Sequence, residues 1–185
     1  MSRSGIRIIG GKWRRRVLRF PDIPDLRPTP DRVRETLFNW LGQSLDDCAC
    51  LDLFAGSGAL GLEAASRNAA RVVMVERNRR ACLAIQENVA LLGATGIEVR
   101  CEDAFAFLKR DDRLFDLVFL DPPYRLDLLP GLLQQLPVHL KPGARVYLEA
   151  EQLPEIPAAY ELARTGRAGQ VHYLLLQSAG HENAI

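Results

Sequence analysis

Short apolar segments alternate with amphipathic ones along most of the chain, and this alternation predicts strands separated by helices. The apolar segments that we interpret as strands are CLDLF (50–54), RVVMVE (71–76), IEVRC (97–101), FDLVFLD (115–121) and ARVYLE (144–149). Helices are expected between them, at about 59–68, along the face carrying Cys82, Ile85, Val89 and Leu92, around Phe105 and Leu108, and at about 127–136. Strands joined by helices form a parallel sheet covered on both faces, and right-handed crossovers make it doubly wound. The predicted fold class is therefore α/β.

The two ends of the chain predict hairpins instead of helical crossovers. IRII (6–9) and VLRF (17–20) flank the sequence GGKWRRR, which favours a small N-terminal β-hairpin. Residues 160–177 read as two strands around a glycine-containing turn, which would add antiparallel pairing at one edge of the sheet.

A proline-rich connector links the first hairpin to the rest of the chain. Residues 21–30 contain four prolines, and Thr29-Pro30 predicts a helix cap with proline at the first helical position. The next helix should carry Val33, Leu37, Trp40 and Leu41 on one face, and Arg32 and Glu35 on the other. We therefore divide the chain into a basic N-terminal hairpin or extension (1–25), a main domain (26–178) and a frayed tail (179–185).

Composition places the chain among ordinary globular proteins. Hydrophobic residues make up 48% and charged residues 25% of its 185 residues, which suffices for a sizeable core. No uncharged apolar run approaches the roughly 18 residues of a membrane helix, and the N-terminus lacks the apolar segment of a secretion signal. The four cysteines are unevenly spaced, which favours reduced thiols over a disulfide scaffold or a metal site. We expect a cytoplasmic, monomeric protein with no metal and no membrane partner.

The net charge of +1 conceals an asymmetry along the chain. Residues 1–40 hold ten Lys or Arg and four Asp or Glu, a net charge of +6, whereas the remainder carries −5. A basic segment before a mildly acidic body favours a polyanionic partner, although a solvated terminus would have the same composition. The residues that we expect to contact RNA are Arg7, Lys12, Trp13, Arg14, Arg15, Arg16, Arg27 and Arg32. For Trp13, packing on the protein is as reasonable as stacking on a nucleotide.

The first predicted strand runs into a glycine loop. Glycines 56, 58 and 61 satisfy G-x-G-x-x-G between a strand and a helix, and Glu76 ends the next strand twenty residues after Gly56. Glycine lets the backbone approach a ligand closely, and an acidic residue at that strand end accepts hydrogen bonds from ribose hydroxyls. The segment predicts an adenosine-containing ligand, the alternative being a tight turn that binds nothing.

Two carboxylates favour S-adenosylmethionine over a dinucleotide as that ligand. Asp52 lies on the strand four residues before Gly56, where its charge would repel a pyrophosphate but suit a sulfonium or ammonium group. Asp103-Ala104 follow the third strand, where a carboxylate could accept a hydrogen bond from the adenine amino group. The absence of G-x-x-x-x-G-K-[ST] argues against a P-loop nucleotidase.

The fourth predicted strand runs directly into Asp121-Pro122-Pro123-Tyr124. Ligands of open α/β sheets bind beyond the carboxyl ends of the strands where the strand order reverses, so this loop should lie beside the glycine loop. Proline fixes φ and donates no backbone hydrogen bond, so the loop offers acceptors to a donor-rich group such as an exocyclic NH₂. By accepting hydrogen bonds from both N–H groups, Asp121 and the Pro122 carbonyl would localise the lone pair of the amine on its nitrogen, which is then ready to attack a methyl group. Tyr124 could stack on the base. A base within a duplex would have to be flipped out or already unpaired.

These residues resemble class I S-adenosylmethionine-dependent methyltransferases that carry [DN]-P-P-[YF], and most closely the bacterial 16S rRNA (guanine-N2)-methyltransferase family (RsmD type). The matching stretches lie within about residues 5–177 and are RIIGGKWRRRVL, LRPTPDRVRETLFNWL, LDLFAGSGALGLEAASR, VERN, DPPY and AGQVHYLL. The resemblance implies a Rossmann-like, mostly parallel seven-stranded sheet, with a methyltransferase domain at 26–178 and a small hairpin extension before it. It also implies methylation of one guanine N2 of 16S rRNA, within the 30S subunit or an assembly intermediate, with S-adenosyl-L-methionine as cofactor.

The resemblance assigns site residues by position. The target base would meet the catalytic residues Asp121, Pro122, Pro123 and Tyr124. The cofactor would be held by Thr29, Asp52, Phe54, Ala55, Gly56, Ser57, Gly58, Glu76, Arg77, Asp103, Ala104 and Asp121. This chain departs from the family at Arg15, where the family usually has glycine in W-R-G-R, and the departure bears on the turn geometry of the basic segment.

Three alternatives remain open from the residues alone. An N6-adenine or other exocyclic-amine nucleic-acid methyltransferase would use the same chemistry around Asp121, and only the N-terminal blocks 7–18 and 26–41 favour guanine. An NAD-dependent oxidoreductase would also have the glycine loop and Glu76. A ribosome-assembly protein with a vestigial cofactor pocket would not depend on Asp121.

Overall fold

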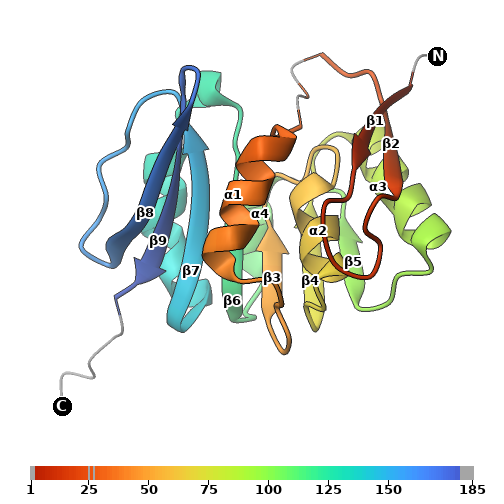
Figure 1. Cartoon of the computed structure of the whole chain (residues 1–185). Helices are drawn as coiled ribbons and strands as arrows, with labels where there is room; N and C mark the ends of the chain where they lie inside the picture. Colours follow the sequence, from red (N-terminus) through yellow and green to blue (C-terminus); the bar gives the residue numbers. More distant parts are fainter. Residues whose placement is uncertain (1–2, 25, 27, 180–185) are drawn as a thin grey trace.

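The computed structural model describes residues 3–24, 26 and 28–179, and its main feature is a seven-stranded sheet in the order β5-β4-β3-β6-β7-β9-β8 (Figure 1). The strands β5, β4, β3, β6 and β7 are parallel, and β9 and β8 extend the sheet in antiparallel fashion. The bounds are β3 (Ala49–Asp52), β4 (Arg71–Val75), β5 (Ile97–Arg100), β6 (Phe115–Leu120), β7 (Leu140–Ala150), β8 (Tyr160–Ala168) and β9 (Val171–Ser178). This confirms the predicted α/β sheet with a hairpin at one edge.

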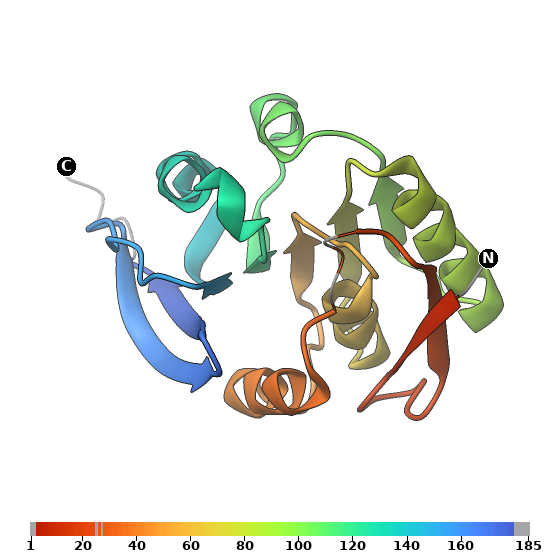
Figure 2. The same cartoon turned by 90° about the horizontal axis from the view of Figure 1, so that it is seen from above.

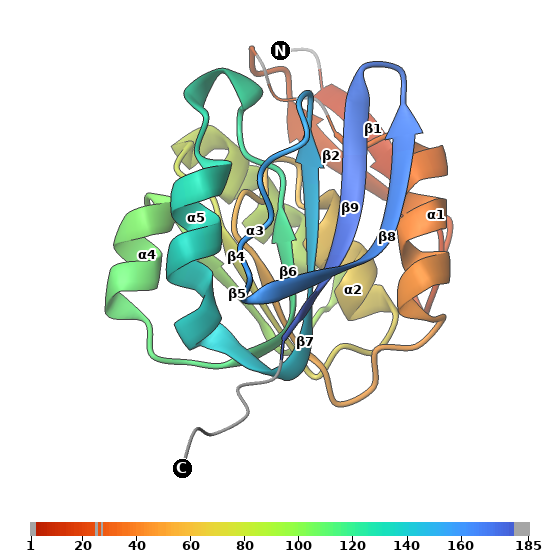
Figure 3. The ribbon, with the colours of Figure 1, turned by 90° about the vertical axis from the view of Figure 1, so that its left-hand side faces the viewer.

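Helices cover both faces of the sheet (Figures 2 and 3). One face carries α1 (Asp31–Leu41), α2 (Ala59–Ser66) and α3 (Arg79–Leu92), and the other carries α4 (Ala104–Arg110) and α5 (Leu129–Gln135). Two short 3-10 turns, η1 (Tyr124–Leu126) and η2 (Leu136–His139), flank α5. None of these helices, all within the described residues, has the length and apolar character needed to cross a membrane.

The central strands are apolar at most positions because each of their faces belongs to a different core. Along β6, Leu117 and Phe119 join the cluster under α1, α2 and α3, whereas Val118 and Leu120 join the cluster under α4 and α5. All four side chains are fully buried. A strand buried on both sides loses the polar alternation of a surface strand, which explains the uninterrupted apolar run LVFL (117–120).

The N-terminal hairpin forms a separate two-stranded antiparallel sheet of β1 (Arg3–Arg7) and β2 (Val17–Pro21), as the sequence predicts. It lies against α3, next to the outer strands of the main sheet (Figure 1). The Asn88 side chain of α3 accepts a hydrogen bond from the Arg19 backbone N–H (3.1 Å) and donates one to its carbonyl oxygen (2.9 Å). Ile8 and Leu18 are buried, so the hairpin shares the core on that face.

The strand order reverses between β3 and β6. The chain runs outward from β3 to β4 and β5 on one side, and from β6 to β7 on the other. The glycine loop follows β3 and Asp121 follows β6, so the two predicted ligand loops leave neighbouring strands at the same edge. This position is the expected ligand site of a doubly wound sheet.

Several predicted boundaries are wrong, and one changes the role of a site residue. Helix α1 begins at Asp31 with Pro30 as its N-cap residue, so Thr29 does not cap it. The Thr29 hydroxyl instead reaches β7, as described below. The strand predicted to include Cys101 ends at Arg100, and Cys101 is exposed. The helix expected from residue 127 starts at Leu129, because η1 precedes it and Asp127 has a left-handed φ of 44°.

Candidate active site

The glycine loop folds tightly at the start of α2. Gly56 and Gly58 have positive φ values of 52° and 80°, which side chains rarely adopt, and Gly58 is the N-cap residue of α2. A Cβ on Gly61 would lie 2.5 Å from Sδ of Met74 on β4. The first two glycines therefore permit the turn, and the third lets α2 pack directly against the sheet. Ala55 and Ser57 are buried in this loop, and Phe54 is partly exposed.

Asp52 is a buried carboxylate beneath the same loop. Its Oδ2 accepts a hydrogen bond from the Gly61 backbone N–H at 2.9 Å. Burial raises the pKa of Asp52 from 3.8 to about 7, and the nearby charge of Glu76 acts in the same direction. Because a second acid, Glu76, lies close enough to act on the charge of Asp52, this end of the sheet suits a cationic ligand group better than an anionic one.

Glu76 connects the end of β4 to the glycine loop. Its Oε2 accepts a hydrogen bond from the Gly56 N–H at 2.9 Å, and its Oε1 accepts one from the Asn78 N–H at 2.7 Å. Arg77, predicted to contact the cofactor, is exposed beside it. A carboxylate has about four lone-pair sites, so Glu76 keeps acceptor capacity for ribose hydroxyls while it holds the loop.

Asp103 and Ala104 lie at the same edge, where α4 begins. Oδ1 of Asp103 accepts hydrogen bonds from the Phe105 N–H (2.9 Å) and the Ala106 N–H (3.1 Å), so Asp103 caps α4. Ala104 is buried under the first turn of that helix. The capping leaves Oδ2 of Asp103 available to another donor.

Asp121 follows β6 directly and opens the proline loop. Pro122 is buried, whereas Pro123 and Tyr124 face solvent, with Tyr124 36% exposed. The pKa of Asp121 is raised well above its usual value, first by burial and then by the charges of Glu149 and Asp52. The structure therefore brings the predicted catalytic loop together with the carboxylates beneath the glycine loop.

Glu149, at the end of β7, is a site residue that the sequence analysis missed. It is 4% exposed, and its Oε1 accepts hydrogen bonds from the hydroxyls of Thr29 (2.7 Å) and Tyr147 (3.0 Å). The Tyr124 hydroxyl lies 3.5 Å from its Oε2. The available signal was a lone acid at the end of the apolar strand ARVYLE, at the level of Asp121 on the neighbouring strand.

A buried ionic network, also missed, positions Thr29. Arg34 of α1 is fully buried, and its guanidinium donates to the carbonyl oxygens of Thr29 (Nε, 3.3 Å) and Arg7 (2.9 Å). It lies 3.6 Å from Oε2 of the buried Glu63 on α2. Glu63 in turn accepts the Ile9 N–H (2.8 Å) and the Gly10 N–H (2.7 Å) of the hairpin loop. The network therefore joins the hairpin, α1 and α2.

The basic loop of the hairpin lies at the opposite end of α2 from the glycine loop. The Lys12 N–H donates to the Ser66 carbonyl oxygen (2.8 Å), whereas Gly58 caps the other end of this helix. Eight helical residues separate these ends by about 12 Å. The predicted RNA contacts that the structure describes are exposed at the end of β1, at this loop and on α1, with Trp13 partly buried: Arg7, Lys12, Trp13, Arg14, Arg15, Arg16 and Arg32. Arg27 lies outside the described residues.

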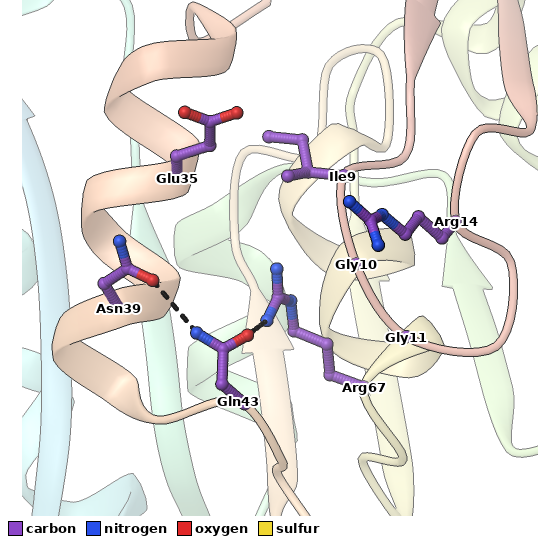
Figure 4. Close-up of a pocket in the computed structure, with 8 residues that line it drawn as sticks. All are labelled: Ile9, Gly10, Gly11, Arg14, Glu35, Asn39, Gln43 and Arg67. Atoms are coloured by element: carbon purple, nitrogen blue, oxygen red, sulfur yellow. Dashed lines mark hydrogen bonds between the residues drawn. The ribbon is translucent and has the colours of Figure 1, made fainter.

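A polar cavity of about 380 Å³ separates this loop from α1 (Figure 4). Glu35 and Asn39 of α1 face it from one side and Arg14 from the other. Gln43 closes its lower end by donating to the Asn39 side-chain oxygen (2.9 Å) while it accepts from the Arg67 guanidinium (2.8 Å). The cavity has donors and acceptors on the basic surface, and it is separate from the carboxylate-lined edge.

Within residues 3–24, 26 and 28–179, no three His, Cys, Asp or Glu gather as a group that could hold an ion. Among the acids of the candidate site, Asp52, Asp121 and Glu149 form no ion pair with another described residue.

Known proteins match nearly the whole chain. A family model described as conserved hypothetical protein 95 matches residues 6–177. Ribosomal RNA small subunit methyltransferase D of Escherichia coli strain K12 is 48% identical over 177 residues, which cover 93% of this chain and 89% of that protein. The protein of the same name from Haemophilus influenzae is 38% identical over 185 residues, covering 96% of each. The solved structure of a candidate methyltransferase from Escherichia coli has a TM-score of 0.88 and 45% identity, covering 96% of this chain and all of that one.

Proposed function

This chain belongs to the ribosomal RNA small subunit methyltransferase D family, and from this premise we propose that it methylates the exocyclic N2 of a guanine in 16S rRNA, with S-adenosyl-L-methionine as the methyl donor. The observation that carries the proposal is the position of Asp121. It stands at the end of β6, beside the glycine loop that follows β3, at the point where the strand order reverses.

The described residues fit a cationic methyl donor better than a dinucleotide. S-adenosyl-L-methionine, when bound, supplies an electrophilic methyl group on a sulfonium. Asp52, Asp121 and Glu149 give this edge three buried acidic groups, whose mutual repulsion a cationic ligand would relieve and a pyrophosphate would increase. Gly56 and Glu76, which hydrogen-bond to each other, would hold the adenosine ribose, and Asp103 and Ala104 the adenine.

The proline loop would prepare the amine for attack. The Asp121 carboxylate and the Pro122 carbonyl accept hydrogen bonds from the two N2–H groups, which localises the nitrogen lone pair. Tyr124 stacks on the base and fixes its plane, a contact worth about 1–3 kcal/mol. Catalysis is then mainly positioning, and the amine loses its proton after the new C–N bond has formed.

The basic surface would hold the rRNA. Lys12, Arg14 and Arg16 are exposed on the hairpin loop, where they can reach phosphates on either side of the target nucleotide. Because the loop lies about 12 Å from the glycine loop along α2, the RNA must contact the enzyme over more than one nucleotide. This requirement favours a folded substrate, the 30S subunit or an assembly intermediate. The proposed rRNA substrate in turn implies a cytoplasmic location.

Nucleoside analysis of a methylation reaction tests the proposal. The protein is incubated with labelled S-adenosyl-L-methionine and 30S subunits from a strain that lacks the modification, and the rRNA is digested to nucleosides. We expect label in 2-methylguanosine. Label in N6-methyladenosine would show that the target base is adenine and would refute the assignment of guanine.

Two variants separate the catalytic role of Asp121 from its contribution to folding. Asp121→Ala should abolish most activity while the protein still folds and binds S-adenosylhomocysteine. Asp127→Ala, which removes an exposed carboxylate from the same loop, is the matched control and should remain active. Full activity of Asp121→Ala would refute the assignment. Stabilisation by NAD instead of S-adenosylhomocysteine in a thermal melt would favour an oxidoreductase.

A further inference from the structure

Glu149 and Asp121 stand side by side at the carboxyl edge of the sheet. β6 and β7 are parallel, with Leu120 paired to Leu148, so the residue that follows each of these leucines is one of the two acids. The Tyr124 hydroxyl, 3.5 Å from Oε2 of Glu149, links the proline loop to β7. The two carboxylates therefore border the same site.

The hydrogen bonds of Glu149 leave one of its oxygens nearly unused. Oε1 accepts from both Thr29 and Tyr147, at 2.7 and 3.0 Å, whereas Oε2 has only the long contact to Tyr124. The side chain is 4% exposed and forms no ion pair with another described residue. A buried carboxylate without a cation is costly unless a ligand with donors completes it.

We propose that Glu149 determines the base specificity of this enzyme by accepting a hydrogen bond from N1–H of the target guanine while Asp121 accepts from N2–H. The inference rests on the proposed function and adds to it the group that distinguishes guanine from adenine. The Watson–Crick edge of guanine carries N1–H and N2–H₂ side by side, and two neighbouring carboxylates match these donors.

Adenine would be rejected by the same group. Its N1 is an acceptor, so a carboxylate at that position would face a lone pair and remain unpaired in a buried site. Sites built to hydrogen-bond a substrate group discriminate strongly against analogues that lack it, because buried polar groups are then left without partners. A hydrogen bond from N1–H to a carboxylate also increases electron density at N2, which makes the amine more nucleophilic.

The charges around the pair agree with this arrangement. The pKa of Glu149 is raised by burial, and the hydroxyls of Thr29, Tyr147 and Tyr124 oppose that rise. Among the charges that raise the pKa of Asp121, Glu149 is the largest contributor. A donor-rich base edge bound between the two acids would relieve their repulsion.

2-Aminopurine provides the discriminating probe because it keeps the exocyclic 2-amino group but has an acceptor at N1. Wild type and Glu149→Gln are compared on 30S subunits reconstituted with guanosine or 2-aminopurine at the methylated position, and kcat/KM is measured for each. We expect wild type to prefer guanosine strongly. Glu149→Gln should lose about ten- to hundredfold on guanosine, the effect of one hydrogen bond to a charged group. It should lose little or nothing on 2-aminopurine, because the glutamine amide can donate to N1.

Control measurements distinguish the proposal from the alternative roles of Glu149. Glutamine can still accept from Thr29 and Tyr147, so the variant should fold, which a thermal melt checks. Glu151→Gln, an exposed acid two residues away, should leave the guanosine preference unchanged. Equal losses on both bases would overturn the proposal in favour of a structural role for Glu149. Weakened binding of S-adenosylhomocysteine by Glu149→Gln would also overturn it, because Glu149 would then contact the cofactor instead of the base. If wild type forms no 2-methylguanosine on guanosine subunits, the proposed function itself fails, and this inference fails with it.

Discussion

The Thr29 hydroxyl donates a 2.7 Å hydrogen bond to Oε1 of Glu149, across 120 residues of sequence. The same residue accepts a hydrogen bond from Nε of Arg34 through its carbonyl oxygen, at 3.3 Å. Thr29 therefore connects the buried network beneath the N-terminal hairpin to the carboxylates at the end of the sheet. The N-terminal part of the chain is thus a structural component of the candidate active site as well as a basic surface.

Removing the Thr29 hydroxyl should destabilise the protein through Glu149. We expect Thr29→Val to lower the free energy of unfolding by about 1–3 kcal/mol, because a buried carboxylate loses a donor and gains none. Thr29→Ser keeps the hydroxyl and should cost less. Urea denaturation of the two variants gives the comparison, and equal unfolding free energies would show that the hydrogen bond contributes nothing.

Arg34 and Glu63 should behave as a coupled pair. Arg34→Met leaves the buried Glu63 with one cation fewer and should cost about 3–5 kcal/mol of unfolding free energy. The double variant Arg34→Met/Glu63→Gln should cost less than the sum of the single variants, by about 0.5–3 kcal/mol. A double-mutant cycle from denaturation curves measures this coupling. Additive losses would mean that the 3.6 Å approach of the two groups is incidental.

Sequence periodicity predicted the fold because the two cores impose regular patterns on the chain. β6 is apolar at every position except Asp116, α3 is apolar at helical spacing, and both formed as expected. The boundary errors fall where tertiary contacts override local preference. Thr29 has the side chain of a helix cap, but its hydroxyl binds a carboxylate on β7, which no local pattern records.

The site was only partly predictable for a related reason. Motifs identify residues that are close in sequence, so the glycine loop and the Asp121 loop could be recognised, and strand order placed them together. Glu149 belongs to no motif, and Arg34 lies in the family block 26–41 with nothing in the sequence that distinguishes it from the other arginines there. Each looks like an ordinary charged residue, and its role depends on burial and on partners more than 25 residues away, such as Thr29 for Glu149 and Glu63 for Arg34.

The raised pKa of Asp52 predicts an unusual pH dependence of stability. Between its usual value of 3.8 and about 7, the native state keeps a proton that the unfolded state releases. The unfolding free energy contributed by Asp52 therefore falls as pH rises through this range, with a slope of up to about 1.4 kcal/mol per pH unit. Asp52→Asn should remove this slope, so its stability relative to wild type should increase from pH 5 to pH 8. Urea denaturation at several pH values checks the sign, and an unchanged difference would contradict it.

The hairpin loop predicts salt-dependent binding of RNA. Each phosphate contact contributes about 0.7–0.9 log units of affinity per log unit of salt, so Lys12→Ala/Arg14→Ala/Arg16→Ala should flatten the slope by up to about 2–3. Lys109→Ala/Arg164→Ala/Arg167→Ala removes the same charge from exposed positions on α4 and β8 and is the matched control. Binding to 30S subunits over a salt series measures both slopes. Equal slopes for the two variants would show that the loop is a solvated surface without phosphate contacts.

Arg15 supplies a prediction in which a substitution stabilises the protein. Its φ is +71°, in the left-handed region, and its backbone N–H donates to the Ile8 carbonyl oxygen at 2.9 Å. A residue with a Cβ pays about 1–2 kcal/mol for this conformation, whereas glycine adopts it freely but loses more entropy on folding. We therefore expect Arg15→Gly to raise the free energy of unfolding by about 0.5–1 kcal/mol. The neighbouring Arg14→Gly, which removes the same charge where φ is not positive, should lower it. If thermal melts showed both variants to be destabilised alike, the strain at Arg15 would have to be compensated by contacts of its side chain.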